Sequence, residues 1–151
     1  MPLSFLYTLF MQPLHYAPKP TLLLLAQDFD ARLVTTLATY GRQAGYPVIL
    51  TGLIAGPIRS HLGVVLFPDR TLDTLGLTEP PWVIIPGTPA CAQALGRDPR
   101  VRRLCQQANT QGGQVFAVPE VYALVEEAGL FPSEPLARAQ VSPWFADYLP
   151  R

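Results

Sequence analysis

The chain has 151 residues, of which 49% are hydrophobic and 15% are charged, and its 11 basic and 11 acidic side chains give a net charge of zero. This length and hydrophobicity suit one domain with a buried core and exclude a disordered chain. A zero net charge, without a basic run, argues against electrostatic binding to nucleic acid or to an anionic membrane. Two cysteines make no disulfide framework, and neither zinc-ligand spacing nor a glycine-rich phosphate loop is present. We therefore expect a cytoplasmic protein with no metal site and no cofactor.

The first 18 residues form an apolar segment that we separate from a domain over residues 19–151. Its apolar run, Leu3 to Met11, is shorter than the roughly 20 residues that span a bilayer. It also lacks the basic start and the small-residue cleavage site of a secretory signal. We expect an arm that packs on the domain or on a partner. A mobile or wrongly assigned start and a contact with a membrane are the two alternatives.

From Thr21 onward, buried strands alternate with amphipathic helices. The expected strands cover residues 22–26, 47–53, 82–87 and 114–118, with a small antiparallel pair at 58–60 and 64–67. The expected helices begin after Asp30, after Asp98 and at Pro119, and they end near Gly45, Gly112 and Gly129. A short helical turn is expected between residues 144 and 149. This alternation predicts an α/β fold, a three-layer α/β/α sandwich with a mostly parallel open sheet. Ligands of such sheets bind outside the carboxyl ends of the strands.

Three segments resemble the PfpI superfamily in their order and spacing. They are residues 56–73 (GPIRSHLGVVLFPDRTLD), 83–114 and 115–131. The superfamily has a flavodoxin-like, class I glutamine amidotransferase-like fold, and it includes the Parkinsonism-associated deglycase and isocyanide hydratases. The subgroup that the chain resembles most is the amidase-like sensor domain of AraC-type transcription regulators. The resemblance covers residues 21–144 and implies this fold and a homodimer.

The same resemblance indicates that the reactive positions of the family hold unreactive side chains here. The family places a nucleophilic cysteine at a strained strand-to-helix turn, where the helix N-terminus lowers the thiol pKa. That position is Phe116, and Val118 replaces the glycine that eases the turn. Leu33 stands where the family has the carboxylate that hydrogen-bonds the cysteine, and Ser142 stands in place of a histidine. We therefore expect a relaxed turn and no catalytic residue.

Several residues at the expected ligand-binding edge remain candidates for binding a ligand. Gly87 belongs to the Gly-Gly step that stabilises an oxyanion in the family, and Thr88 replaces the second glycine. Thr88 donates its hydroxyl into that pocket or serves the turn. Asp28 follows the first strand and is either a ligand-site carboxylate or a loop residue that helps to cap the next helix. Phe116, followed by Ala117, fills the former active site or forms an apolar wall for a ligand.

Two cysteines, one histidine and a group of arginines have structural interpretations that we favour. Cys91, at the start of an expected helix, is a displaced reactive thiol or, as we favour, a buried residue that packs the helix on the sheet. Cys105 lies on the apolar stripe of the helix after Asp98 and belongs to the core. His61 is expected in a tight surface turn. The arginines around Arg100 are expected to form a solvated helix face.

These observations together predict a catalytically inactive PfpI-like domain that senses a small-molecule ligand, regulates, or binds a protein partner as a homodimer. One alternative is a cysteine-dependent hydrolase or lyase that uses Cys91. The other is a remnant of an AraC-type regulator without its DNA-binding domain, because no helix-turn-helix region is present and the chain stops at Arg151, before the family's last strand and helix. We also expect the arm, residues 1–18, to cover the sheet edge that the absence of the family's last strand would leave bare.

Overall fold

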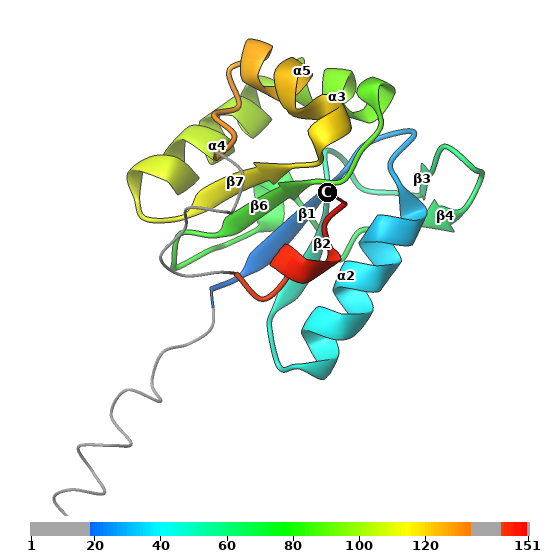
Figure 1. Cartoon of the computed structure of the whole chain (residues 1–151), viewed down its shortest axis with the longest axis horizontal. Coiled ribbons are helices and arrows are strands. Elements are labelled where there is room, and N and C mark those ends of the chain that lie inside the picture. The colour runs from blue at the N-terminus through cyan, green and yellow to red at the C-terminus, as the bar shows by residue number, and fades with distance from the viewer. Residues whose placement is uncertain (1–18, 134–142, 151) are drawn as a thin grey trace, which may run out of the picture.

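A parallel five-stranded sheet organises the fold (Figure 1). The computed structural model describes residues 19–133 and 143–150, so the arm and Ser142 lie outside the described residues. The strands are β1 (Thr21–Leu25), β2 (Val48–Gly52), β5 (Arg70–Thr71), β6 (Trp82–Ile85) and β7 (Gln114–Ala117). Their spatial order is β5-β2-β1-β6-β7, and every pairing is parallel. The expected α/β fold with a mostly parallel sheet is confirmed.

The central strand is β1, and its sequence explains its place. Every residue of Thr21–Leu25 is buried, so both faces of the strand meet other layers of the structure. A continuously apolar strand of this kind suits the middle of a parallel sheet that is covered on both sides. Leu23 lies in register with Leu50 of β2 on one side and with Ile84 of β6 on the other.

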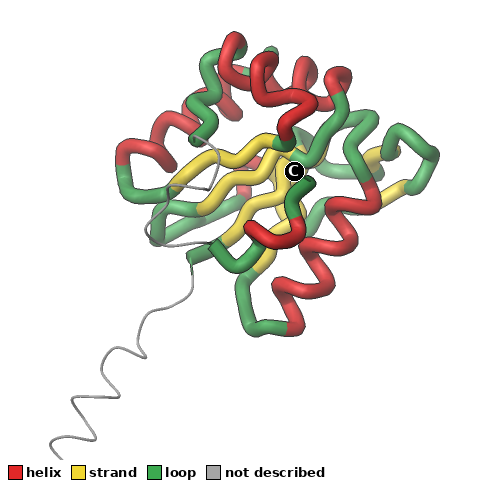
Figure 2. The backbone as a smooth tube through the Cα atoms, viewed as in Figure 1, coloured by secondary structure: helices red, strands yellow, loops and turns green. Residues whose placement is uncertain are grey.

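Helices cover both faces of the sheet, as Figure 2 shows. They are α2 (Ala31–Gln43), α3 (Pro89–Gly96), α4 (Pro99–Thr110) and α5 (Tyr122–Glu127). From β1 the chain moves to β2 and from β6 it moves in the opposite direction to β7, so right-handed crossovers place α2 on one face and α3 and α4 on the other. None of the helices among the described residues is long and apolar enough to span a bilayer.

The helix boundaries follow the caps that the sequence predicts. The Asp30 carboxylate accepts a hydrogen bond from the backbone N–H of Leu33 at 3.1 Å, and Asp98 accepts one from the N–H of Arg100 at 2.9 Å. Gly45, just after α2, has a φ of +86°, a conformation that favours glycine. The helix expected at Pro119 begins instead as a 3₁₀ turn, η3 (Pro119–Val121), before α5. Such turns are common at the start of α-helices.

A two-stranded antiparallel sheet, β3 (Ile58–Arg59) with β4 (Val65–Leu66), confirms the expected pair. The sequence did not predict β5 or the 3₁₀ turn η2 (Leu72–Thr74) that follows it. β5 is only two residues long and therefore shows no strand pattern in the sequence. Its pairing with β2 and the contacts of the segment before it keep it in place. In that segment, the Asp69 carboxylate accepts a hydrogen bond from the N–H of Leu50 at 2.8 Å. It also pairs with Arg42 of α2 at 2.6 Å.

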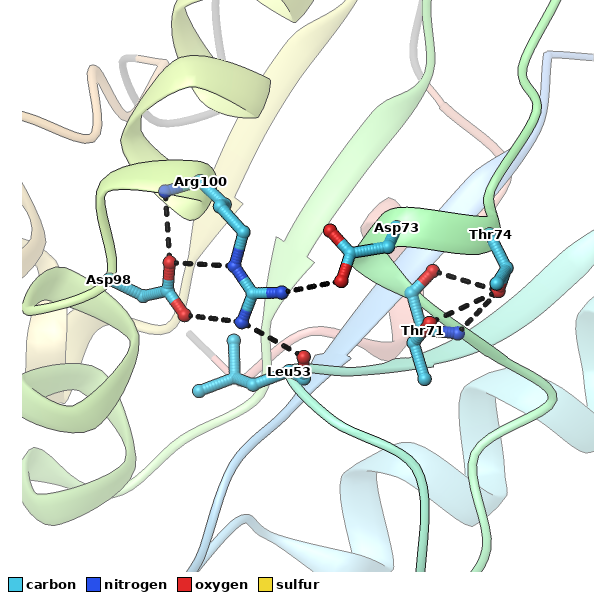
Figure 3. Close-up of polar contacts among 6 residues, drawn as sticks. All are labelled: Leu53, Thr71, Asp73, Thr74, Asp98 and Arg100. Carbon is cyan, nitrogen blue, oxygen red and sulfur yellow. Dashed lines mark hydrogen bonds and ion pairs between the residues drawn. The ribbon is translucent and has the colours of Figure 1, made fainter.

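Arg100 joins three parts of the chain (Figure 3). Its guanidinium pairs with Asp98 at 2.9 Å and with Asp73 of η2 at 3.0 Å, and it donates to the carbonyl of Leu53 at 2.9 Å. The hydrogen bond from Arg100 is the main reason why the pKa of Asp98 lies below its ordinary value. The expectation of a solvated arginine face is therefore wrong for Arg100, because partners distant in the sequence meet its guanidinium.

The C-terminal segment, residues 143–150, covers the sheet on the same side as α2. It contains the expected turn as η5 (Ala146–Tyr148), which contacts α2. Phe145 is fully buried and meets the rings of Trp82 at 5.4 Å and of Phe116 at 4.8 Å, both edge to face. Trp144 stacks on Tyr46 at 5.3 Å. These contacts close the sheet face over β6 and β7.

Candidate functional site

A pocket of about 300 Å³ lies where the carboxyl ends of β1, β6 and β7 meet. This is the edge at which the sequence predicts a ligand site. The residues that line it come from five separate stretches of the chain: Asp30, His61, Gly87, Thr88, Val118, Pro119, Glu120 and Pro150. Two of the predicted ligand-site residues, Gly87 and Thr88, are therefore part of the pocket.

Thr88 serves the backbone of the turn with both functions of its hydroxyl. Its Oγ1 donates to the carbonyl oxygen of Asp28 at 2.7 Å and accepts from the backbone N–H of Cys91 at 3.3 Å. It is thereby the N-cap of α3. The sequence analysis considered two roles for the Thr88 hydroxyl, donation into the pocket and support of the turn. In the structure the hydroxyl supports the turn and caps α3.

Asp28 has an unusual backbone but does not line the pocket. Its φ of +67° lies in the left-handed region, which aspartate adopts more easily than most residues. Its N–H donates to the carbonyl of Arg59 at 2.9 Å, and its carbonyl accepts from Thr88. Asp30, two residues later, lines the pocket and caps α2 with its carboxylate. The structure therefore brings Asp30, rather than Asp28, into the pocket.

His61 and Glu120 are pocket residues that the sequence analysis did not select. The Nδ1 atom of His61 lies 3.2 Å from the carbonyl oxygen of Phe29, which also accepts the backbone N–H of His61 at 3.1 Å. Donation from Nδ1 leaves Nε2 as the acceptor of the neutral ring. Glu120 directly follows Pro119 at the end of β7, and this position after a strand was the signal that could have identified it.

Phe116 and Leu33, which the sequence resemblance places at the family's reactive positions, are packing residues. Phe116 is 4% exposed, and its ring faces Phe145 rather than the pocket. Neither Phe116 nor Val118 has a positive φ, so the turn is relaxed, as expected. Leu33 is buried in α2, and the half-buried Ala117 does not line the pocket.

Cys91 is a fully buried thiol beside Gly87. A Cβ atom on Gly87 would lie 3.0 Å from the Cβ of Cys91 and 3.3 Å from its Sγ, so the close approach of α3 favours glycine there. Burial raises the pKa of Cys91 to about 11, and the charge of Asp28 adds to this, whereas a backbone hydrogen bond with Ala26 opposes it. Burial raises the pKa of Cys105 to about 12. These are properties of core thiols rather than of activated nucleophiles.

The described residues contain no group of three or more histidine, cysteine, aspartate or glutamate side chains that could hold a metal ion. Asp30, His61 and Glu120 therefore share a pocket without forming a metal site in this part of the chain. What they offer a ligand is two carboxylates and an imidazole, all able to accept hydrogen bonds.

The fold matches solved structures of DJ-1 and ThiJ/PfpI proteins. DJ-1beta of Drosophila melanogaster is 24% identical, and the match covers 74% of this chain and 61% of that protein with a TM-score of 0.67. Oxidised DJ-1 of Toxoplasma gondii is 20% identical, with 87% and 71% covered and a TM-score of 0.66. A ThiJ/PfpI domain protein of Brachyspira murdochii is 15% identical, with 83% and 84% covered and a TM-score of 0.62.

No family model matches the sequence, and no curated protein matches it. The chain spans about three fifths of the length of the Drosophila protein. The structural matches nevertheless cover most of the chain, 74% and 87% of it for the two DJ-1 proteins. The chain therefore has the fold of the DJ-1/ThiJ/PfpI proteins.

Proposed function

We propose that the chain is a PfpI-like domain without cysteine catalysis that binds a small polar ligand at the carboxyl edge of its sheet. The observation that carries this proposal is the position of Phe116. Its ring is buried against Phe145 at the point where the resemblance places the family's nucleophile. A phenyl ring supplies no nucleophilic atom. Because the packed ring fills this position, no other side chain takes its place there.

The two thiols give the proposal a second support. Both Cys91 and Cys105 are fully buried, and burial raises the pKa of Cys91 to about 11 and the pKa of Cys105 to about 12. Only the thiolate is a nucleophile, so a buried thiol with a raised pKa reacts slowly at neutral pH. The alternative, a hydrolase or lyase that uses Cys91, needs the opposite shift.

The ligand class follows from the lining of the pocket. Asp30, His61 and Glu120 line it, whereas none of the described lysines and arginines does. Such a lining accepts hydrogen bonds and favours positive charge, so a small amine or a polyol suits it better than an anion. Binding without turnover would serve sensing or regulation, the role of the AraC-type sensor domains that the sequence resembles.

A binding screen with a matched control tests this proposal. Small amines, amino acids and polyols are added to the protein, thermal shifts are measured, and compounds that stabilise it are titrated by calorimetry. We expect Glu120→Gln to weaken binding of an amine at least tenfold. Glu127→Gln, an exposed carboxylate on α5 outside the pocket, should leave binding unchanged.

Turnover is measured on the same compounds by NMR. We expect none of them to be consumed over hours. Consumption that Cys91→Ala abolishes would support the cysteine-enzyme alternative and overturn the proposal. If Glu120→Gln and His61→Asn both left binding unchanged, the ligand would bind outside this pocket and the proposed site would be wrong.

A further inference from the structure

The C-terminal segment brings the chain into the wall of the pocket. Phe145 is fully buried, and Tyr148 of η5 stacks on Tyr40 of α2 at 5.0 Å. From η5 the backbone runs toward the carboxyl edge of the sheet, as Figure 1 shows, and Pro150 lines the pocket. Because packed aromatic rings hold the residues just before it, Pro150 has a fixed place beside the pocket.

The residue after Pro150 is Arg151, which lies outside the described residues. Consecutive Cα atoms are about 3.8 Å apart across a trans peptide, so Arg151 begins beside the pocket. An arginine side chain is a long stem that ends in a planar cation with five N–H donors. The sequence therefore places a guanidinium within reach of the pocket.

The pocket offers the negative charge and the hydrogen-bond acceptors that a guanidinium requires. Within the described part of the chain, neither Asp30 nor Glu120 forms an ion pair. Asp30 uses its Oδ1 to cap α2 and accepts no hydrogen bond with Oδ2 from another described residue. The Nε2 atom of His61 is a third acceptor when Nδ1 donates to the backbone. Hydrogen bonds between a guanidinium and a carboxylate are among the strongest in proteins.

We propose that the Arg151 guanidinium occupies this pocket as an internal ligand, paired with Asp30 and Glu120, and that a small guanidinium compound binds by displacing it. This inference rests on the proposed function and narrows the ligand class to planar cations. A tethered group competes at an effective concentration on the order of millimolar. The internal ligand thus excludes simple cations and selects ligands that make further contacts with the pocket.

Carbodiimide cross-linking tests the contact on the full chain without an added ligand. Arg151→Lys keeps the positive charge and supplies an amine, which the reagent joins as an amide to a carboxylate in contact with it. We expect mass spectrometry of the monomer to find position 151 linked to Glu120 or Asp30. Arg103→Lys, on the exposed face of α4 outside the pocket, should give no link to these carboxylates. Absence of the link in Arg151→Lys would overturn the proposal.

An NMR titration with methylguanidinium separates this proposal from the proposed function. We expect Arg151→Gln to bind it at least fivefold more tightly than the wild type, because the competitor is removed, and Arg103→Gln to bind like the wild type. Equal affinities of Arg151→Gln and wild type, with binding that Glu120→Gln still weakens, would overturn the internal ligand and leave the proposed function intact. If methylguanidinium binds to neither protein, the guanidinium class is wrong, whereas binding of another amine would still support the proposed function.

Discussion

Phe145 lies edge-on against Phe116, with the ring centroids 4.8 Å apart and the ring planes at 78°. Aromatic pairs favour this arrangement, because the positive edge of one ring meets the negative face of the other. The contact joins the C-terminal segment to the end of β7 and removes both rings from solvent. Phe116, which the sequence resemblance places at the family's reactive position, is thereby part of the hydrophobic core.

Replacing Phe145 with alanine should lower the free energy of unfolding by about 3–5 kcal/mol, as for other buried phenylalanines. The loss combines apolar burial with the contacts to Phe116, Trp82 and Trp144. Guanidinium unfolding measures it. Tyr148→Ala is the control, because that ring stacks on Tyr40 at 5.0 Å but stays 41% exposed, so its loss should be much smaller. Equal stability of Phe145→Ala and wild type would mean that the segment does not pack on the sheet.

The two cysteines should resist alkylation in the native state. Cys91 and Cys105 are fully buried, and their raised pKa values leave few thiolates at pH 7–9. Iodoacetamide labelling with a mass-spectrometric readout should therefore modify neither residue until denaturant is added. Fast labelling of Cys91 below pH 7, with Cys105 protected, would instead demonstrate a low-pKa thiol at the sheet edge.

The same pKa values predict a loss of stability at alkaline pH. The thiols ionise at about 9 in the unfolded chain but at about 11 and about 12 in the fold, so the unfolded state loses protons first. Their stabilising contribution is complete below pH 9. Between that pH and the pKa in the fold, about 11 for Cys91 and about 12 for Cys105, it decreases by about 1.4 kcal/mol per pH unit for each thiol. Urea unfolding at pH 8 and 10.5 measures this decrease. The Cys91→Ala/Cys105→Ala variant should lose less stability between these two pH values, and an equal loss would contradict the assignment.

The sequence predicts elements whose signals are local and misses those that form between distant segments. The apolar run of β1 and the Asp30 cap of α2 need only neighbouring residues, so both could be located in advance. By contrast, β5 is two residues long and exists because β2 accepts it at the edge. The pocket shows the same limit, because His61 and Glu120 lie 59 positions apart in turns of ordinary composition. Only the folded sheet brings such residues together.

Arg100 should be more important for stability than its neighbour Arg103, although both lie near the start of α4. Arg100 binds Asp98, Asp73 and the carbonyl of Leu53, whereas Arg103 is exposed. Arg100→Gln should therefore lower the melting temperature, and Arg103→Gln should leave it nearly unchanged. NMR titration should also show the pKa of Asp98 rising toward its ordinary value in Arg100→Gln, because the first cause of its depression is lost. Equal melting temperatures of the two variants would contradict this role.

A cysteine placed at position 116 should not create an enzyme. In Phe116→Cys the new thiol would lie beneath Phe145, where burial disfavours the thiolate, and Leu33 offers no carboxylate to assist it. We expect no turnover of methylglyoxal or of simple amides, and a stability loss close to that of Phe116→Ala, about 3–5 kcal/mol. Comparing the two variants separates the lost ring from the added thiol. Turnover by Phe116→Cys that Phe116→Ala lacks would show that a functional base lies within reach of position 116, and that the register placing Leu33 at the acid position is wrong.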